Sequence, residues 1–445
     1  MAAVQPPACL ADLNDDLLRK IISRLAESEL ASAVALKRCS SRFKDLAAPL
    51  VANAVSVTNE KWQSAASKIG GPVGAKITGA LERNEVLTSL DVGGNKIGPT
   101  GATAIAEALK GNGVLTTLDL SGNEICSIDE DGDGEYDASG IVALADALKV
   151  NGVLTSLDVR NNKIGPTGAT AIADALKGSG VLKTLTLRSN NIGDEGAKAI
   201  GGALAVNEVL TSLDVSGNRI GPTGATAIAE ALRVNAVLTN LDIAYNDIGP
   251  GGAEAIAEAL QGNGVLTTLN LSGNPLFRGG IGPEGASAIA EALKGNKVLN
   301  TINLRGNYLG TEGWCAIFAA LRDNKENKIE SWDLSRQGID VEVAKVLAEY
   351  VSGSAVLTSL DVGGNAIGDE GATAVASALE VNGMLTNLNL RRNRIRDEGA
   401  AALASALRVN GVLKNIDLRY NRLGDEGKGV IRDAVSGREG FKLEM

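Results

Sequence analysis

The side chains with the clearest capacity for chemistry are carboxylates concentrated between residues 129 and 137. These nine residues hold six of them: Asp129, Glu130, Asp131, Asp133, Glu135 and Asp137. Carboxylate oxygens are the ligands that Ca²⁺ prefers in proteins, and glycine at 134 would let the backbone turn sharply between them. Asp129, Asp131, Asp133 and Asp137 are therefore candidate Ca²⁺ ligands.

The same stretch resembles the loop of an EF-hand, with oxygen ligands at loop positions 1, 3, 5 and 9 and a glycine at position 6. Position 12 is Gly140, where an EF-hand carries a bidentate glutamate. The flanking segments have the pattern of one strand and one helix instead of two EF-hand helices. The resemblance implies weak Ca²⁺ binding, and the alternative is a flexible acidic loop without a metal.

Other kinds of catalytic chemistry have little support in the sequence. The chain of 445 residues contains no histidine, so the commonest general base and metal ligand is missing. The sequence has no nucleophile elbow, phosphate-binding loop or cysteine pair with metal-ligand spacing. We therefore expect a protein that is not an enzyme and requires no cofactor.

The acidic stretch interrupts a repeat that fills most of the chain. Residues 87–97 (LTSLDVGGNKI) recur twelve times, and the step between units is 28 residues except for steps of 39, 33 and 30. An asparagine ends the conserved core of each unit except the ninth, where Gln337 replaces it; the asparagines are Asn95, Asn123, Asn162, Asn190, Asn218, Asn246, Asn274, Asn307, Asn365, Asn393 and Asn421. Such a period indicates a solenoid in which each unit packs on its neighbours.

One unit shows how the repeat is expected to fold. Leu90 and Val92 alternate with polar residues, which predicts a short strand with one apolar face. Asn95 follows where the chain must turn, and stacked turns would form a ladder of buried asparagines. Residues 101–109 then have the spacing of a helix that faces inward with Ile105 and Leu109.

The pattern L-x-x-L-x-L-x-x-N-x-L resembles leucine-rich repeats of the ribonuclease-inhibitor-like class, which also occur in NOD-like receptor sensor domains and Ran GTPase-activating proteins. The resemblance covers residues 51–445, with insertions near 126–137 and 275–280. It implies an α/β fold: a curved solenoid with parallel strands on the concave face and helices on the convex face. It also implies a protein-binding scaffold, or alternatively an activator of a small GTPase, although the acidic tail usual in such activators is missing.

The concave face is the predicted partner site. Eight of the twelve units carry aspartate at the outward position that follows the second strand leucine. Tyrosines and arginines, which are enriched in interface hot spots, interrupt the pattern near the strand ends. The helix residue Trp314 also departs from the repeat. We predict that the partner contacts Asp214, Asp242, Tyr245, Arg305, Tyr308, Asp361, Arg391, Arg392, Arg419 and Tyr420; the alternative is a hydrated face without a partner.

Residues 1–50 lack the repeat and show helix-spaced apolar residues instead. The opening Leu13-Asn-Asp-Asp, the helix pattern from Ile21 to Leu25 and the Cys39-Ser-x-x-Phe43 segment resemble an F-box. Asn14 and Phe43 replace the family's usual proline and tryptophan. The resemblance implies that residues 10–46 bind the linker subunit of a cullin ubiquitin ligase, so that the repeats would select a substrate. The alternative is a helical cap on the first repeat.

Charge and hydropathy limit the classes of partner that the chain is expected to bind. The formal net charge is −10, which disfavours nucleic acid and anionic membranes as partners. No apolar run approaches the roughly 18 residues of a membrane span, and no secretory signal is evident at the start. We expect a cytoplasmic or nuclear protein that binds another protein.

Overall fold

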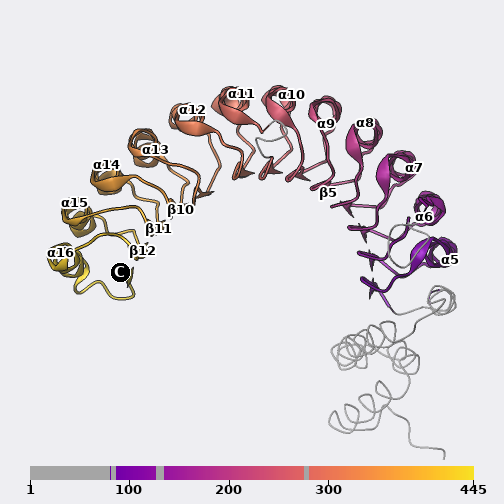
Figure 1. Cartoon of the computed structure of the whole chain (residues 1–445), viewed down its shortest axis with the longest axis horizontal. Helices are drawn as coiled ribbons and strands as arrows, with labels where there is room; N and C mark the ends of the chain where they lie inside the picture. The colour runs from indigo at the N-terminus through magenta and orange to yellow at the C-terminus, as the bar shows by residue number, and fades with distance from the viewer. Residues whose placement is uncertain (1–80, 82–86, 127–134, 275–279) are drawn as a thin grey trace, which may run out of the picture. The chain divides into compact units, whose positions relative to one another are not determined.

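The computed structural model describes residues 81, 87–126, 135–274 and 280–445 (Figure 1). The chain divides into two compact units, residues 1–159 and 160–445. The predicted F-box-like segment, the loop residues Asp129, Asp131 and Asp133, and the insertion at 275–279 lie outside the described residues. No helix among the described residues is long and apolar enough to cross a membrane.

Among the described residues of the first unit, three parallel strands alternate with two helices. The elements are β1 (Ser89–Asp91), α5 (Gly98–Gly111), β2 (Thr117–Asp119), α6 (Ser139–Val150) and β3 (Ser156–Asp158). Leu90 in β1 stands beside Leu118 in β2, which stands beside Leu157 in β3, so that equivalent leucines line up across the sheet. These leucines are buried because the apolar face of each strand is covered by the helices.

The second unit continues the alternation of helix and strand. Its elements are α7 (Gly165–Gly178), β4 (Thr184–Thr186), α8 (Gly193–Leu204), β5 (Ser212–Asp214), α9 (Pro222–Leu232), β6 (Asn240–Asp242), α10 (Gly249–Gly262), β7 (Thr268–Asn270), α11 (Gly282–Gly295), β8 (Thr301–Asn303), α12 (Gly310–Asp323), β9 (Ser331–Asp333), α13 (Val341–Gly353), β10 (Ser359–Asp361), α14 (Gly368–Val381), β11 (Asn387–Asn389), α15 (Asp397–Val409), β12 (Asn415–Asp417), α16 (Asp425–Val435) and β13 (Lys442–Glu444).

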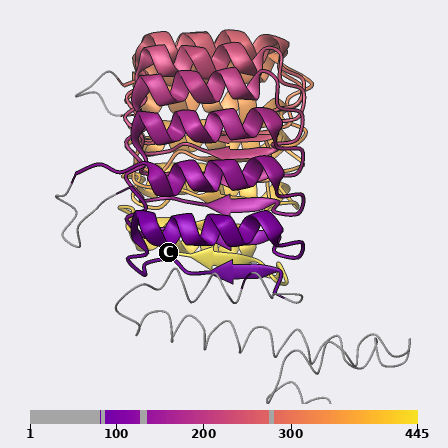
Figure 2. The ribbon, with the colours of Figure 1, turned by 90° about the vertical axis from the view of Figure 1, so that its right-hand side faces the viewer.

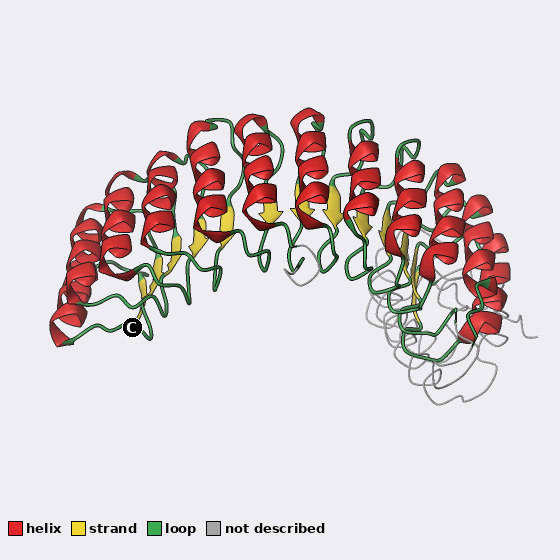
Figure 3. Ribbon diagram, turned by 45° about the horizontal axis from the view of Figure 1, so that its top comes forward, coloured by secondary structure: helices red, strands yellow, loops and turns green. Residues whose placement is uncertain are grey.

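Within the second unit, the strands run parallel in sequence order, from β4 to β8 and from β9 to β13. The helices stack side by side with similar axis directions (Figure 2) and lie on the outer rim of an arc whose inner rim is formed by the strands (Figures 1 and 3). This arrangement confirms the predicted α/β leucine-rich repeat solenoid, with strands on the concave face and helices on the convex face.

The two layers are held together by an apolar core that repeats from unit to unit. In the unit around β5, Leu213, Val215, Ile220 and Ile228 are 0–1% exposed. The small residues of the helices allow neighbouring helices to approach closely: a Cβ atom added at Gly224 would lie 2.8 Å from the Cβ of Ala197. Glycine and alanine at these helix positions therefore set the close spacing of the convex layer.

The asparagines of the conserved core form the predicted ladder. Asn218 is fully buried, and its Oδ1 accepts hydrogen bonds from the backbone N–H groups of Asn190, at 2.8 Å, and Ile192, at 3.4 Å. Its Nδ2 donates to the carbonyl oxygens of Leu187, at 2.9 Å, and Ser216, at 3.1 Å. Each ladder asparagine thus satisfies buried backbone groups of its own turn and of the preceding unit.

A second ladder lies at the other end of the repeat, where each helix returns to a strand. The Oδ1 of Asn235 accepts from the N–H groups of Val237 and Leu238, and its Nδ2 donates to the carbonyl oxygens of Leu204 and Asn207. Equivalent asparagines include Asn112, Asn151, Asn207, Asn263, Asn382 and Asn410, all buried. They supply partners for helix C-terminal carbonyls that have none within the helix.

The junction between β8 and β9 departs from the repeat. Within the described strands, β8 and β9 belong to separate sheets. Here the Oε1 of Gln337 accepts from the N–H of Gly306 at 2.8 Å, and Trp332 replaces the usual strand leucine. Trp332 packs edge-on against Trp314 and Phe318, while Phe318 stacks on Tyr350. Larger aromatic side chains fill the core where the 30-residue step changes the spacing of the strands.

The junction also explains why Trp314 departs from the repeat. Its side chain is 1% exposed and stacks on Phe318, with 5.7 Å between the ring centroids. Trp314 is therefore a core residue and not a contact for a partner. The sequence position is that of a small helix residue, but the junction needs a large side chain to pack against Trp332.

Replacing Asn218 with alanine is expected to destabilise the second unit by about 2–4 kcal/mol, because the buried N–H groups of Asn190 and Ile192 lose their acceptor. Chemical denaturation would measure the change. The control is Thr226→Ala, which removes an exposed hydroxyl bonded to the carbonyl of Pro222 on α9. If Asn218→Ala lowers the free energy of unfolding by no more than Thr226→Ala does, the ladder does not stabilise the turns.

Candidate interaction surface

The strand-end aspartates have a structural role in every unit where their contacts are seen. The Oδ1 atoms of Asp214, Asp242 and Asp361 accept from the backbone N–H two residues later, at 2.9, 3.0 and 2.7 Å. Asparagine does the same at 270 and 389, at 3.1 and 3.0 Å. This local bond stabilises the turn that ends the strand, which explains why the position is almost always Asp or Asn.

The second carboxylate oxygen of these aspartates faces neighbouring strands. Asn270 donates to the Oδ2 of Asp242 at 2.9 Å, and Asn389 donates to the Oδ2 of Asp361 at 2.8 Å. Burial raises the pKa of Asp242 above its usual range, and the hydrogen bonds from Ala244 and Asn270 oppose the shift. Asparagines between the aspartates thus relieve repulsion that a continuous aspartate column would create.

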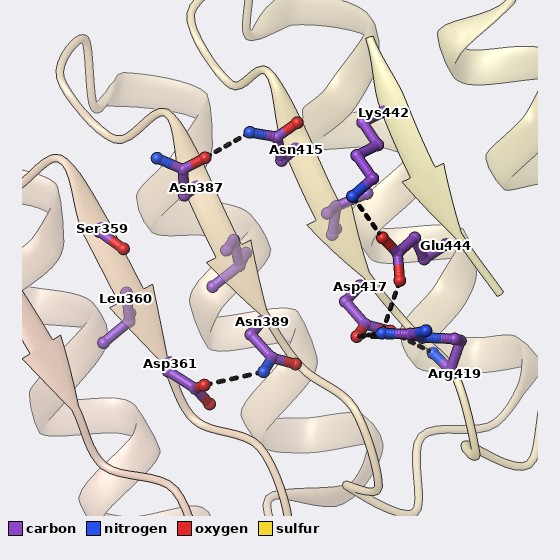
Figure 4. A pocket seen from close by; sticks show the side chains of 12 residues that line it. Ser359, Leu360, Asp361, Asn387, Asn389, Asn415, Asp417, Arg419, Lys442 and Glu444 are labelled. Carbon is purple, nitrogen blue, oxygen red and sulfur yellow. Dashed lines mark hydrogen bonds and ion pairs between the residues drawn. The ribbon is translucent and has the colours of Figure 1, made fainter. Parts of the chain in front are cut away.

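Two grooves lie on the strand side of the second unit. One, of about 400 Å³, crosses β5–β8 and is lined by polar strand residues that include Asp214, Asp242 and Asn303. The other, of about 370 Å³, crosses β10–β13 and is lined by Asp361, Asn389, Asp417, Arg419 and Glu444 among others (Figure 4). Both present carboxylate, amide and hydroxyl groups above a row of strand leucine or isoleucine side chains.

Charged side chains at the end of the second groove are paired with one another. Arg419 contacts the Oδ2 of Asp417 at 2.6 Å and the Oε2 of Glu444 at 2.5 Å, while Lys442 contacts the Oε1 of Glu444 at 2.7 Å. Burial opposes ionisation of Asp417, but the hydrogen bonds from Arg419 outweigh it and lower the pKa of Asp417. The hydrogen bond from Lys442 is the main cause that lowers the pKa of Glu444.

Three tyrosines project from the turns next to the strand ends. Tyr245, Tyr308 and Tyr420 are 63%, 61% and 65% exposed, and their φ angles are 55°, 51° and 59°. A side chain in this left-handed region costs roughly 1–2 kcal/mol relative to the ordinary helical region. Six other units place glycine at the position of Tyr245 and Tyr420, where the cost is absent. The ring of Tyr245 lies over Gly273, where an added Cβ would come within 2.6 Å of it.

The predicted arginines fall into different environments. The guanidinium carbons of Arg391 and Arg392 lie 4.4 and 4.9 Å from the ring centre of Tyr420, so these three residues form one cluster. Arg419 belongs instead to the ion pairs of the second groove. Arg305 forms an ion pair with Asp333 of the next unit.

The predicted contact residues therefore separate into two regions. Asp214, Asp242 and Tyr245 belong to β5, β6 and the turn that follows, whereas Arg305, Tyr308, Asp361, Arg391, Arg392, Arg419 and Tyr420 belong to β8–β12 and their turns. Sequence reasoning missed Arg336, Lys442 and Glu444. Arg336 occupies the same turn position as Arg392, and aligning the units position by position would have identified it.

Of the predicted calcium ligands, Asp137 is described. Its Oδ1 accepts from the N–H of Ser139 at 2.8 Å, at the start of α6. Within the described ranges, no group of three or more acidic or cysteine side chains is arranged to hold a metal ion. The calcium site stays a prediction, since Asp129, Asp131 and Asp133 lie outside those ranges.

The pairing around Arg419 predicts how β13 responds to acid. Because the pKa values of Asp417 and Glu444 are lowered in the folded chain, their stabilising contribution is complete above the unfolded values, about 4. It is lost as the pH falls below about 4 and both groups are protonated. Hydrogen exchange of the Leu418 amide, which donates to the carbonyl of Glu444, should show falling protection over this range. The variant Arg419→Gln should show a smaller change, and constant protection down to pH 2.5 would contradict the account.

Comparison with known proteins supports the fold. A family model described as a leucine-rich repeat matches residues 83–106, 111–125, 150–173, 181–201, 206–229, 234–257, 262–290, 353–376 and 381–404. A search of curated protein sequences found no match.

Several solved structures resemble the chain. A structure of the Rad7 and Elc1 complex in yeast matches with 15% identity and a TM-score of 0.47, covering 98% of each chain. An internalin from Listeria monocytogenes matches with 17% identity and a TM-score of 0.47, covering 84% of this chain and 95% of the internalin. A leucine-rich repeat protein from Legionella pneumophila matches with 20% identity and a TM-score of 0.41, covering 66% of this chain and 94% of the other. With nine matches of the repeat model and the repeating strand, asparagine turn and helix of each unit, the chain is a leucine-rich repeat protein.

Proposed function

We propose that this chain is a non-enzymatic scaffold that binds a protein partner on the concave face of its second unit. The observation that carries the proposal is the set of exposed tyrosines and arginines at strained turn positions beside the strands. Tyr245, Arg336, Arg392 and Tyr420 all have positive φ angles where other units have glycine. Retaining large side chains there, at a cost to folding, is consistent with selection for contact with a partner.

The grooves favour a protein over an apolar small molecule as the ligand. Small-molecule pockets are usually enclosed and mostly apolar. The grooves over β5–β8 and β10–β13 are lined instead by rows of Asp, Asn, Ser and Thr that can exchange hydrogen bonds with a peptide chain or with polar side chains. The exposed tyrosines beside them would supply the apolar contact area that such an interface needs.

The finer subtype of the repeat belongs to the same proposal. Helices of 11–14 residues in the second unit cover the convex side of a unit of 28 residues. Long helices at this position support the ribonuclease-inhibitor-like class of leucine-rich repeats. The F-box-like role of residues 10–46 and activation of a small GTPase stay alternatives from the sequence.

A photo-cross-linking amino acid tests the proposed face. With benzoylphenylalanine in place of Tyr245, ultraviolet light should yield a defined adduct with a partner from the native cell extract. The same amino acid at Glu230, which is exposed on α9, should give no such adduct. Equal cross-linking of one partner from both positions would show that the concave side is not selective.

The variant Tyr245→Gly separates binding from folding. Glycine suits the left-handed turn, so the free energy of unfolding should stay the same or rise by about 1 kcal/mol. Affinity for the cross-linked partner should fall by about tenfold or more if the tyrosine is an interface anchor. The control Glu230→Ala should leave the affinity unchanged. Unchanged affinity in Tyr245→Gly would remove this tyrosine from the interface.

A further inference from the structure

A hollow of about 240 Å³ lies among the turns that follow β8–β11 in the second unit. The unit of β10 places Gly363 and Gly364 at two turn positions where the neighbouring units carry larger side chains. The unit before it has Ser335 and Arg336, and the unit after it has Arg391 and Arg392. The hollow exists because these two glycines have no side chains to fill the space between the arginine-bearing turns on either side.

Four arginines line this hollow: Arg305, Arg336, Arg391 and Arg392. Arg305 is paired with Asp333. Among the described residues, the other three form no ion pair, and the Nε of Arg391 is buried without a hydrogen-bond acceptor. The guanidinium groups of Arg391 and Arg392 both lie over the ring of Tyr420, which holds them in place by cation–π attraction.

The local charge is positive in a chain that is acidic overall. Asp361 is the carboxylate in the wall of the hollow, and it already accepts hydrogen bonds from Gly363 and Asn389. The four arginines carry four positive charges, and Asp361 and Asp333 carry two negative charges. Two positive charges are therefore in excess. Arg391 and Arg392 are held against the same tyrosine ring, so their like charges repel, and an anion bound beside them would offset that repulsion.

We propose that this hollow binds the phosphate group of a phosphorylated side chain on the partner protein, which rests on the concave face being a protein-binding surface. A phosphate monoester carries close to two negative charges, which matches the local excess. The planar arginine fork donates two parallel hydrogen bonds to phosphate oxygens. The neighbouring strand ends carry Asp333 and Asp417, so an extended acidic peptide would be repelled where a single concentrated charge would not.

Calorimetric titration of the full chain tests the proposal with three small probes. They are N-acetyl-phosphoserine-methylamide, its aspartate counterpart and inorganic phosphate. The phosphoserine probe should bind one site saturably, with affinity that falls as salt rises. The aspartate probe should bind at least about tenfold more weakly, because it presents one charge and two oxygens. Absence of saturable binding by the phosphoserine probe, or equal binding of the aspartate probe, would overturn the proposal. Tighter binding of inorganic phosphate than of phosphoserine would overturn the assignment to a phosphorylated protein.

Variants of the lining residues locate the site. Arg336→Gln and Arg392→Gln should each weaken the phosphoserine probe by about tenfold or more, as expected for loss of a charge-assisted hydrogen bond. Arg408→Gln, an equal change of charge at an exposed position on α15, should leave binding unchanged. Equal effects of all three variants would mean that only the overall charge matters, which would overturn the site.

A steric variant tests the hollow without removing any arginine. Gly363→Gln places an uncharged side chain where equivalent units already carry Ser216, Ala244 and Ser335, so the backbone accommodates a Cβ. The added Cβ would lie 2.9 Å from a carboxylate oxygen of Asp361, and this side chain can shift to make room. Binding of the phosphoserine probe should be lost while the unfolding midpoint is kept. Undiminished binding would place the phosphate elsewhere.

The two proposals fail in different ways. Loss of the phosphate site with retained cross-linking from Tyr245 would leave the scaffold intact and overturn only the phosphate assignment. Probe binding without any selective cross-link at Tyr245 would instead overturn the contact proposed over β5–β7, while the hollow would stand as an anion site.

Discussion

The two asparagine ladders are the constraint on which the rest of the second unit depends. Each ladder side chain pairs with backbone groups of its own unit and of the unit before it, as Asn218 and Asn235 do. A buried amide group left without a partner costs roughly 1–3 kcal/mol, so a change of period must either keep the pairing, as between Asn274 and Asn307, or rebuild it. At Gln337 it is rebuilt with a longer side chain, and there the strands divide into two sheets.

Because the ladders fix the turns, equivalent side chains stand in columns beside the strands. The aspartate and asparagine column ends the strands and hydrogen-bonds along itself. The two positions directly before the ladder residue vary from unit to unit, with Gly, Ser, Ala, Asn, Arg or Tyr. The surface of the unit is therefore determined by a few residues: Tyr245, Arg336, the glycine pair at 363–364, Arg391 and Arg392, and Tyr420. Their differences create both the exposed aromatic contacts and the arginine hollow.

The repeating elements could be predicted from the sequence. Contacts between side chains of different units could not. The strand, the ladder asparagine and the helix followed from period and hydropathy alone. The second ladder was missed because Asn235 and its equivalents look like ordinary loop residues until the helix carbonyls they satisfy are placed beside them. The role of Trp314 could not be inferred from its own unit, because its packing depends on Trp332, which belongs to a later unit. The grooves and the hollow could not be predicted, because they arise from turns that a three-dimensional register brings together.

Hydrogen exchange of the full chain with and without its native partner tests the central claim most directly. The account predicts that protection on binding concentrates at the strand ends and following turns of β5–β12, around Tyr245, Arg336, Arg392 and Tyr420. The exposed faces of α8–α15 should exchange at the same rate in both states. Protection confined to those convex helices, with the strand-end turns unchanged, would contradict it.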